Sequence, residues 1–546
     1  MSIHWRNALK QNFLPALLLI GWGSTGCQAH GRFKDQPVVW KVDDKRSISE
    51  PEERKYELYA QPMDWFLMRR LNRVLEFRDQ EIAHNINSLG EVPDSTWFTN
   101  RIGIRDVSPK EAALAASHQG PPVPPLQVVG GKAGGHNPGF FAKDSTGRKF
   151  VIKFDSKNTP KMQTGINTMV NRIFWTAGYN VANDTIFHFV PSQVSVAPGS
   201  KLTDEVGDKR PITQEDIDNV LKLVAQSADG TYRATASQFI DGIPKGGWST
   251  EGVREDDPND TIPHEHRREV RGWRTFSAWV NHTDIKEDNT LDAYVEEDGR
   301  KFIKHYLVDF GEALAGHAAK KDRFEDGYEH WLDWYAFTKG MFTFGLWVRT
   351  WEPLRDKPWP AFHSFSADYF DPTKWKEAYN YWPFAEADAG DEYWAAKIIM
   401  RFDRPVLDAI IQTGELGDPA SEKYLADTLI RRRDLIGRAY IQTVTALDYF
   451  KISPQRLCAT DLSVRFNLVD FGVVELLDDN DEPTWDRLVA SNGDVCIPIP
   501  AGEGYHVYRL RTRRRAVSTP VMQIHFRSGK NARVLGVVRI EEHTPN

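Results

Sequence analysis

Residues 281–311 read NHTDIKEDNTLDAYVEEDGRKFIKHYLVDFG, and the interpretation of the whole chain depends on this stretch. It begins with the pattern H-x-D-x-K-x-x-N, formed by His282, Asp284, Lys286 and Asn289. It ends with the triplet Asp309-Phe310-Gly311. These polar groups can form one site only if the chain folds back between them.

The residues between the two clusters predict such a return of the chain. Apolar and β-branched residues are frequent in Leu291–Val295 and Phe302–Val308, and the polar turn Glu296–Arg300 separates them. This pattern is typical of two strands joined by a tight turn. The resulting hairpin would bring Asn289 and Asp309 together.

The residue types in the two clusters are those that phosphoryl transfer requires. A carboxylate orients the attacking hydroxyl and accepts its proton, a cation holds the transferred phosphate, and two oxygen ligands hold the Mg²⁺ that bridges the phosphates. We predict Asp284 for the first role, Lys286 for the second, and Asn289 with Asp309 for the third. The alternative is that Asp284 and Asn289 cap turns before the hairpin.

A second copy of one motif shows how little that motif indicates alone. Leu468–Gly472 repeats the pentapeptide LVDFG of Leu307–Gly311. No D-x-x-x-x-N precedes the second copy at a comparable distance, so we predict that Asp470 is an ordinary residue at the end of a strand. The prediction of a site therefore rests on the ordered combination of motifs.

A nucleotide site of this kind also needs a lysine on an upstream strand. Phe150–Asp155 reads as such a strand, with Lys153 in its middle. The glycine-rich stretch Gly130–Gly139 precedes it, and glycines let backbone amides approach phosphates closely. The candidates for nucleotide contact in this stretch are Gly134, Gly135 and Asn137; the alternative is an ordinary loop.

An acidic partner for Lys153 is missing from the expected place. Residues 157–183 contain no Asp or Glu, and the predicted helix at 162–178 offers Gln163 and Asn167 instead. Either an acid from elsewhere positions Lys153, or the site has lost its activity.

The order of lysine strand, D-x-x-x-x-N and DFG resembles the protein-kinase-like superfamily over about residues 126–445. In detail the chain is most similar to the atypical HipA-type kinases. Their phosphate loop has a G-x-x-P pattern, as in Gly135–Pro138, and their catalytic loop reads N-x-x-D-x-x-x-x-N, as in Asn281–Asn289. The chain also resembles a group of uncharacterised bacterial envelope proteins, in stretches such as Pro93–Phe98.

The resemblance implies a two-lobed kinase-like domain that binds ATP with Mg²⁺ or Mn²⁺. It implies Asp284 as the base, Asn289 and Asp309 as metal ligands, and Lys153 in contact with the nucleotide phosphates. Lys286 matches the lysine that contacts the transferred phosphate in typical protein kinases.

The 546 residues allow two or three domains, and we predict an α+β fold. After a partly helical lead-in at 28–125, the kinase-like domain would span 126–445, with a small lobe at 126–242 and a large lobe at 243–445. The strand at 233–240 and the Gly/Pro-rich turn after it would form the hinge between the lobes. From 452 to 546 short strands predict an all-β sandwich module. Its predicted strands are 462–466, 473–477, 495–499, 506–510, 522–526 and 534–540.

Two groups of arginines are expected on solvated helix faces. Arg267, Arg268 and Arg271 have acidic neighbours in sequence, although an arginine cluster can also bind phosphate. Arg431–Arg433 lie in a predicted helix that begins at Asp418-Pro419, a typical N-cap followed by a first-turn proline.

The N-terminus predicts export. Arg6 and Lys10 precede the apolar run Phe13–Trp22. A positive segment followed by a short apolar run is typical of a secretory signal, here at 1–27. Small residues before Cys27 predict a bacterial lipoprotein cleavage site with lipid on Cys27. The alternative is a buried N-terminal helix. By analogy with lipoprotein sorting, Gln28 favours the periplasmic side of the outer membrane.

Other compositional features limit the partners. A net charge of −7 gives no overall attraction to nucleic acid, and no later stretch approaches the ~20 apolar residues of a membrane span, so only a lipid anchor to the membrane is expected. Cys458 and Cys496 could form a disulfide in an oxidising periplasm, but the sequence leaves their proximity open.

Two functions follow. The first is an exported phosphotransferase that moves phosphate from ATP-Mg²⁺ to a hydroxyl on a protein, glycan or small molecule. The alternative is an inactive pseudokinase-type envelope lipoprotein that acts in binding or assembly. Eight of the 18 tryptophans lie between Trp331 and Trp394, and aromatic clusters stack on sugars, so glycans are a candidate ligand; a buried core is the commoner fate of Trp.

Overall fold

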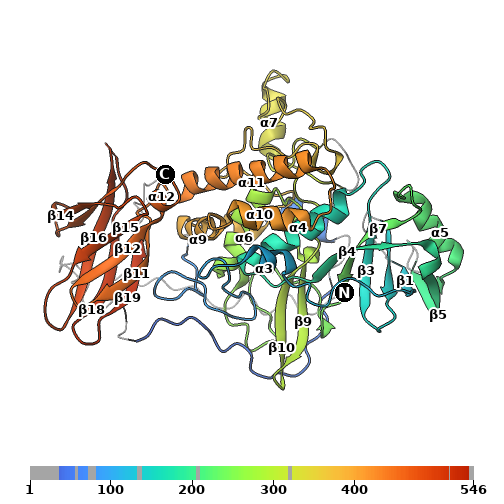
Figure 1. The fold of residues 1–546 in the computed structure, drawn as a ribbon, viewed down its shortest axis with the longest axis horizontal. Coiled ribbons are helices and arrows are strands. Elements are labelled where there is room, and N and C mark those ends of the chain that lie inside the picture. The colour runs from blue at the N-terminus through green and yellow to red at the C-terminus, as the bar shows by residue number, and fades with distance from the viewer. Residues whose placement is uncertain are drawn as a thin grey trace, which may run out of the picture.

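The computed structural model describes residues 33, 36–55, 60–69, 71, 81–131, 138–203, 209–317, 323–515 and 517–539. The predicted signal sequence with Cys27 lies outside these residues, as do the loop candidates Gly134, Gly135 and Asn137. Within the described residues the fold is α+β, as predicted (Figure 1). No helix among them combines the length and the apolar character that a membrane crossing requires.

A seven-stranded sheet forms one end of the molecule (Figure 1). Its strand order is β4-β7-β3-β2-β1-β5-β6, and it has its own core of buried apolar residues. The pairs are antiparallel except β1 with β5. The strands are β1(Leu126–Gly131), β2(Gly139–Lys143), β3(Lys149–Phe154), β4(Asn183–Phe189), β5(Val194–Thr203), β6(Lys209–Pro211) and β7(Tyr232–Gln238). Helices α4(Met162–Ala177) and α5(Gln214–Leu223) lie between strands in sequence.

The centre of the molecule is helical and carries the predicted hairpin (Figure 1). Strands β9(Thr290–Glu297) and β10(Arg300–Leu307) pair antiparallel, which confirms the hairpin, and β8(Ile243–Pro244) pairs with β9. Asp298 and Gly299 both have positive φ, as a two-residue type I′ turn requires. The main helices are α3(Pro109–Leu114), α6(Arg268–Val280), α7(Trp334–Phe342), α8(Trp382–Ala385), α9(Ala389–Ile399), α10(Arg404–Gln412) and α11(Pro419–Tyr440).

Residues of the predicted lead-in are part of the largest core. Val92, Trp97, Phe98 and Ile102 are buried with residues of α4, α6, α9 and α11. Before them, the short helix α1(Ala60–Met63) continues into the π-helical turn η1(Asp64–Met68). The lead-in is therefore partly helical, but it packs into the body instead of forming a separate segment.

The C-terminal part consists of two sheets, with strand orders β11-β12-β15 and β14-β13-β16-β18-β19. Residues of both sheets share one apolar core. The predicted strand at 462–466 is wrong, because Asp461 caps a short helix there by accepting hydrogen bonds from the amides of Ser463 and Val464. The strands are β11(Leu447–Ser453), β12(Arg456–Asp461), β13(Val473–Leu477), β14(Pro483–Leu488), β15(Asp494–Pro498), β16(Gly504–Arg514), β17(Val517–Ser518), β18(Met522–Ser528) and β19(Arg533–Arg539), and the helix is α12(Leu462–Arg465).

The predicted solvated positions are wrong for Arg267, Arg268, Arg271 and Arg432, whereas Arg431 is exposed as expected. Arg267, Arg268 and Arg271 are buried, and their guanidinium groups pair with acids such as Asp260 and Asp391. Charged side chains that fold into the interior need such partners, because an unpaired buried charge is costly.

Arg432 on α11 is buried beside an exposed neighbour. Helix α11 begins where predicted, with Asp418 capping its first amides. The Arg432 guanidinium donates to the carbonyl oxygens of Trp279 (2.8 Å), Ser366 (2.7 Å) and Ala278 (2.5 Å). These bonds tie α11 to the C-terminal end of α6, directly before the candidate catalytic loop.

Arg432→Ala should therefore destabilise the protein, because three buried carbonyl oxygens lose their donor. We expect the free energy of unfolding to fall by about 3 kcal/mol or more. Arg431 is exposed and pairs with Asp368 at the surface, so Arg431→Ala should change it by no more than about 0.5 kcal/mol. Urea unfolding followed by tryptophan fluorescence measures both values. Equal effects of the two substitutions would contradict the role given to Arg432.

Candidate functional site

The candidate catalytic loop connects α6 to β9. Helix α6 ends at Asn281, whose left-handed backbone turns the chain into the loop. Lys286 pairs with the Asp284 carboxylate at 2.9 Å. The Asn289 side-chain amide donates to the Asp284 carboxylate (2.8 Å) and carbonyl oxygen (2.7 Å). The amide nitrogen of Asn289 thus faces Asp284, which leaves its oxygen to meet a cation.

The hairpin brings the second cluster to this loop, as predicted. Thr290 pairs with Leu307, and the Val308 amide donates to the Asn289 carbonyl oxygen at 3.0 Å. Asp309 follows with a φ of 61°, which is uncommon for a residue with a side chain. This conformation is typical of functional positions that the surroundings hold in place.

Lys153 lies on β3, which confirms the predicted strand, and its ammonium group pairs with Asp309 at 2.8 Å. The Asp309 side chain remains 41% exposed. The structure therefore brings together five predicted site residues: Lys153, Asp284, Lys286, Asn289 and Asp309. The side-chain oxygen atoms of Asn289 and Asp309 are the hard ligands that Mg²⁺ and Mn²⁺ prefer, so these two residues fit the implied metal.

Helix α4 holds the Asp309-Phe310-Gly311 segment in place. The Asn167 side-chain oxygen accepts a hydrogen bond from the Phe310 amide at 3.0 Å. The Phe310 ring stacks on Phe174, with 5.1 Å between ring centroids. A Cβ atom at Gly311 would lie 2.3 Å from the Gln163 side-chain oxygen, so a larger residue there would displace the end of that side chain.

A cavity of about 320 Å³ opens beside these groups, between the seven-stranded sheet and the hairpin. Its volume falls within the range of small-molecule sites. Lys153 and Asp309 lie at its polar side, and the predicted hinge supplies Ser237–Ile240 and Gly242 along another wall. Its apolar lining includes Val151, Ala182, Leu291, Ala293 and Val308.

Asp184 on β4 is an acid near Lys153 that the sequence analysis missed. Its side chain is buried, lines the same cavity, and accepts hydrogen bonds from Asn167 (2.6 Å) and Asn171 (3.2 Å). Burial raises the pKa of Asp184, and the positive charge of Lys153 acts in the opposite direction. Asp184 follows the acid-free stretch directly, so a search that continued into the next strand would have found it.

Glu312, directly after the DFG triplet, is a second missed residue. Burial, with the nearby carboxylates of Asp284 and Asp309, raises the pKa of Glu312 to about 8. Burial also raises the pKa of Asp326 to about 7, against the opposing effect of Arg323. Several carboxyl groups thus crowd one side of the catalytic loop, an arrangement that a cation relieves.

The lead-in supplies further missed contacts to the loop. The Trp65 indole donates to the Glu287 carboxylate at 3.2 Å, and the Arg69 guanidinium forms a buried ion pair with the same carboxylate. Since Glu287 lies between Lys286 and Asn289, these contacts hold the loop from outside the kinase-like region of 126–445. No local pattern in the sequence relates positions so far apart.

The second LVDFG copy also borders a cavity, but among the described residues no catalytic loop and no strand lysine meet it there. The Asp470 side chain is 85% exposed and pairs with Arg515 at 3.2 Å at the surface. It precedes β13 in a surface loop, so its prediction as a residue at the end of a strand is corrected to a residue before one.

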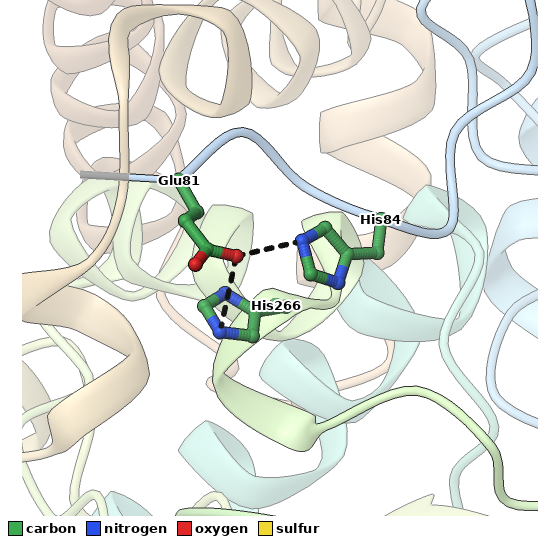
Figure 2. A group of neighbouring side chains, drawn as sticks. All are labelled: Glu81, His84 and His266. Atoms are coloured by element: carbon green, nitrogen blue, oxygen red, sulfur yellow. Dashed lines mark hydrogen bonds and ion pairs between the residues drawn. The ribbon is translucent and has the colours of Figure 1, made fainter. Parts of the chain in front are cut away.

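Figure 2 shows a separate group of potential metal ligands, Glu81, His84 and His266. Arg271 donates a hydrogen bond to Nδ1 of His266 at 2.8 Å, and guanidinium groups cannot accept one. Nδ1 therefore supplies its lone pair to Arg271, and the ring proton is on Nε2, which points to Glu81. A metal needs the lone pair of Nε2, so we assign no metal to this group.

No model of a known protein family matches the chain, and no curated protein matches its sequence. The interpretation of the site therefore rests on its residues and their geometry.

Glu312→Gln should stabilise the protein in a pH-dependent way. Because folding raises the pKa of Glu312 from 4.5 to about 8, the native state holds the proton more tightly than the unfolded state. The resulting loss of stability is absent below pH 4.5, grows between pH 4.5 and about pH 8, and is complete above about pH 8. The melting temperature of the variant should exceed that of the wild type only at the alkaline end.

The exposed hairpin acid Glu296 provides the matched control, Glu296→Gln. A Glu312→Gln variant whose melting temperature follows the wild type across this pH range would contradict the crowding of carboxyl groups.

Proposed function

We propose that the chain is a kinase-like phosphotransferase that binds ATP with Mg²⁺ or Mn²⁺ and phosphorylates a hydroxyl group. The observation that carries this proposal is the ion pair of Lys153 and Asp309 at a 320 Å³ cavity, with the catalytic-loop residues Asn289, Asp284 and Lys286 beside it. Residues from β3, the catalytic loop and the end of the hairpin contribute, so their convergence is a property of the fold.

The proposal includes a two-lobed domain. The seven-stranded sheet and the helical centre have separate apolar cores, and the cavity is lined from both sides, which supports small and large lobes near the predicted boundaries. Helix α4 packs with the core of the larger lobe. We also propose a C-terminal sandwich, supported by the core that the last two sheets share. Since β11 belongs to it, this module would begin at Leu447 instead of 452.

Each residue has a chemical role in this proposal. Bound ATP with its metal supplies the phosphoryl group and the charge that neutralises it. Lys153 binds the nucleotide phosphates, and the carboxylate of Asp309 with the side-chain oxygen of Asn289 holds the metal. Asp284 orients the acceptor hydroxyl and takes its proton, while Lys286, 2.9 Å away, is placed to contact the transferred phosphate.

The predicted export belongs to the proposal as well. Cys458 and Cys496 form a disulfide across the paired strands β12 and β15, and disulfides persist in oxidising compartments such as the periplasm. This supports a periplasmic location, while the lipid anchor at Cys27 and the outer membrane are proposed from the N-terminal sequence.

One observation favours the alternative of an inactive nucleotide-binding protein. Lys153 pairs with Asp309, the proposed metal ligand. Among the described residues, its ion pair is with this acid and not with Asp184. An active site requires Lys153 to leave Asp309 for the nucleotide phosphates. The two experiments below separate binding from transfer.

Asp309→Asn should abolish metal-dependent nucleotide binding, because it removes the charged metal ligand. We expect ATP with Mg²⁺ at a hundredfold excess over its Kd to raise the melting temperature of the wild type by about 4 °C, and not to raise that of the variant. Asp470→Asn, in the identical pentapeptide, is the matched control and should respond like the wild type. Equal responses of both variants would overturn the site assignment.

Asp284→Asn should leave nucleotide binding intact and slow phosphate transfer by about 10²–10⁴-fold, since it removes only the proton acceptor. The release of ADP from radiolabelled ATP, with candidate protein and glycan acceptors from the cell envelope, measures this rate. Binding without any release of ADP by the wild type would favour the inactive alternative.

A further inference from the structure

Helix α7 and the turn after it form an apolar projection, which we call the α7 tip (residues 334–349). It stands out from the helical centre at the top of Figure 1. At its end, the side chains of Phe342, Phe344 and Leu346 are 76%, 92% and 85% exposed. Large apolar side chains so fully exposed and so close together mark an interaction surface.

The amides of residues 343–346, at the end of the α7 tip, are all bonded within the turn. The amides of Thr343 and Gly345 donate to the carbonyl oxygens of Lys339 and Gly340, both at 3.0 Å. The Phe344 and Leu346 amides are likewise bonded within the turn. A segment whose amides are already paired can leave water at low cost, which an apolar medium requires.

The charges of the α7 tip have one sign. Residues 334–349 contain Lys339 and Arg349 and no Asp or Glu. The Lys339 ammonium lies 4.4 Å from the centroid of the Trp347 ring and 5.4 Å from that of Tyr335. Trp347, Tyr335 and Lys339 thus lie between the body of the protein and the apolar end of the tip. Trp, Tyr and Lys are the side chains that favour the membrane–water interface.

The base of the α7 tip is fixed to the body. Asp333 caps the first turn of α7 and pairs with Lys376 at 2.5 Å. In the segment that returns to the body, Arg349 pairs with Glu329, and the Trp351 indole donates to the same carboxylate at 2.8 Å. The projection is thus held in position, so its end presents the apolar side chains outward.

We propose that the α7 tip inserts into an anionic membrane surface. Nine residues of helix rise about 14 Å, which is enough to bury the end of the tip about 5–10 Å deep while Lys339 stays among the headgroups. The convex shape, the absence of acidic residues in 334–349 and the paired amides of the turn at 343–346 favour lipid over a protein partner. This contact would act beside the lipid anchor, which was expected to be the only attachment, and it does not depend on the proposed kinase activity.

The test reads the environment of the tip directly. Phe344→Cys is labelled with the fluorophore NBD in the full chain carrying Cys27→Ser, which removes the acylated cysteine. Vesicles of phosphatidylethanolamine with phosphatidylglycerol should shift the emission of this label to shorter wavelength and raise its intensity. Vesicles of phosphatidylcholine alone should do so more weakly. A label at Asn480→Cys, exposed in the C-terminal part, should not respond.

Two further substitutions define the contact. Phe342→Ser with Leu346→Ser should raise the lipid concentration at half-maximal response at least about tenfold, because both remove apolar surface. Lys339→Glu should raise it for the anionic vesicles only, also about tenfold. If the label at position 344 responds to neither vesicle, the proposal is overturned even where the protein sediments with lipid, and a protein partner becomes the occupant.

Discussion

The hydrogen bond from the Val308 amide to the Asn289 carbonyl oxygen completes the β9–β10 ladder, and the candidate site depends on it. Side chains alternate between the two faces of a strand, so a shift of one residue would turn Asp309 away from Asn289. The type I′ turn at Asp298-Gly299 fixes the register at the far end of the hairpin. The distance between the two proposed metal ligands is thus determined by backbone pairing.

Segments distant in sequence hold this hairpin and its loop. The Ile48 amide donates to the Lys301 carbonyl oxygen at 2.9 Å, and Lys45 pairs with Glu297 at 2.8 Å, so the lead-in runs along the hairpin. On another side Arg69 pairs with Glu287 in the loop. The described lead-in therefore belongs to the architecture of the site. The base of the α7 tip lies close by, since the Tyr379 ring contacts both Trp331 and Trp65.

Local patterns in the sequence predicted the elements that local energetics decide. The hairpin, the strand with Lys153, and the N-cap of α11 at Asp418 follow from alternation, turn residues and capping. The strand predicted at 462–466 failed locally, because the Asp461 cap starts a helix there, but other misses are long-range. Nothing near Arg432 in sequence reveals the carbonyl oxygens that draw it into the interior. Likewise Asp184 approaches Lys153 only because β4 and β3 both pair with β7.

The central claim is that Asn289 and Asp309 hold a metal that binds nucleotide phosphates. The most direct measurement is an anomalous difference map from crystals of the protein grown with Mn²⁺ and a non-hydrolysable ATP analogue. The account predicts one manganese peak between the Asn289 side-chain oxygen and the Asp309 carboxylate, with Lys153 released from Asp309 and bound to phosphate. Nucleotide bound outside the cavity at β3 and the hairpin, or manganese at Glu81, His84 and His266 instead, would contradict it.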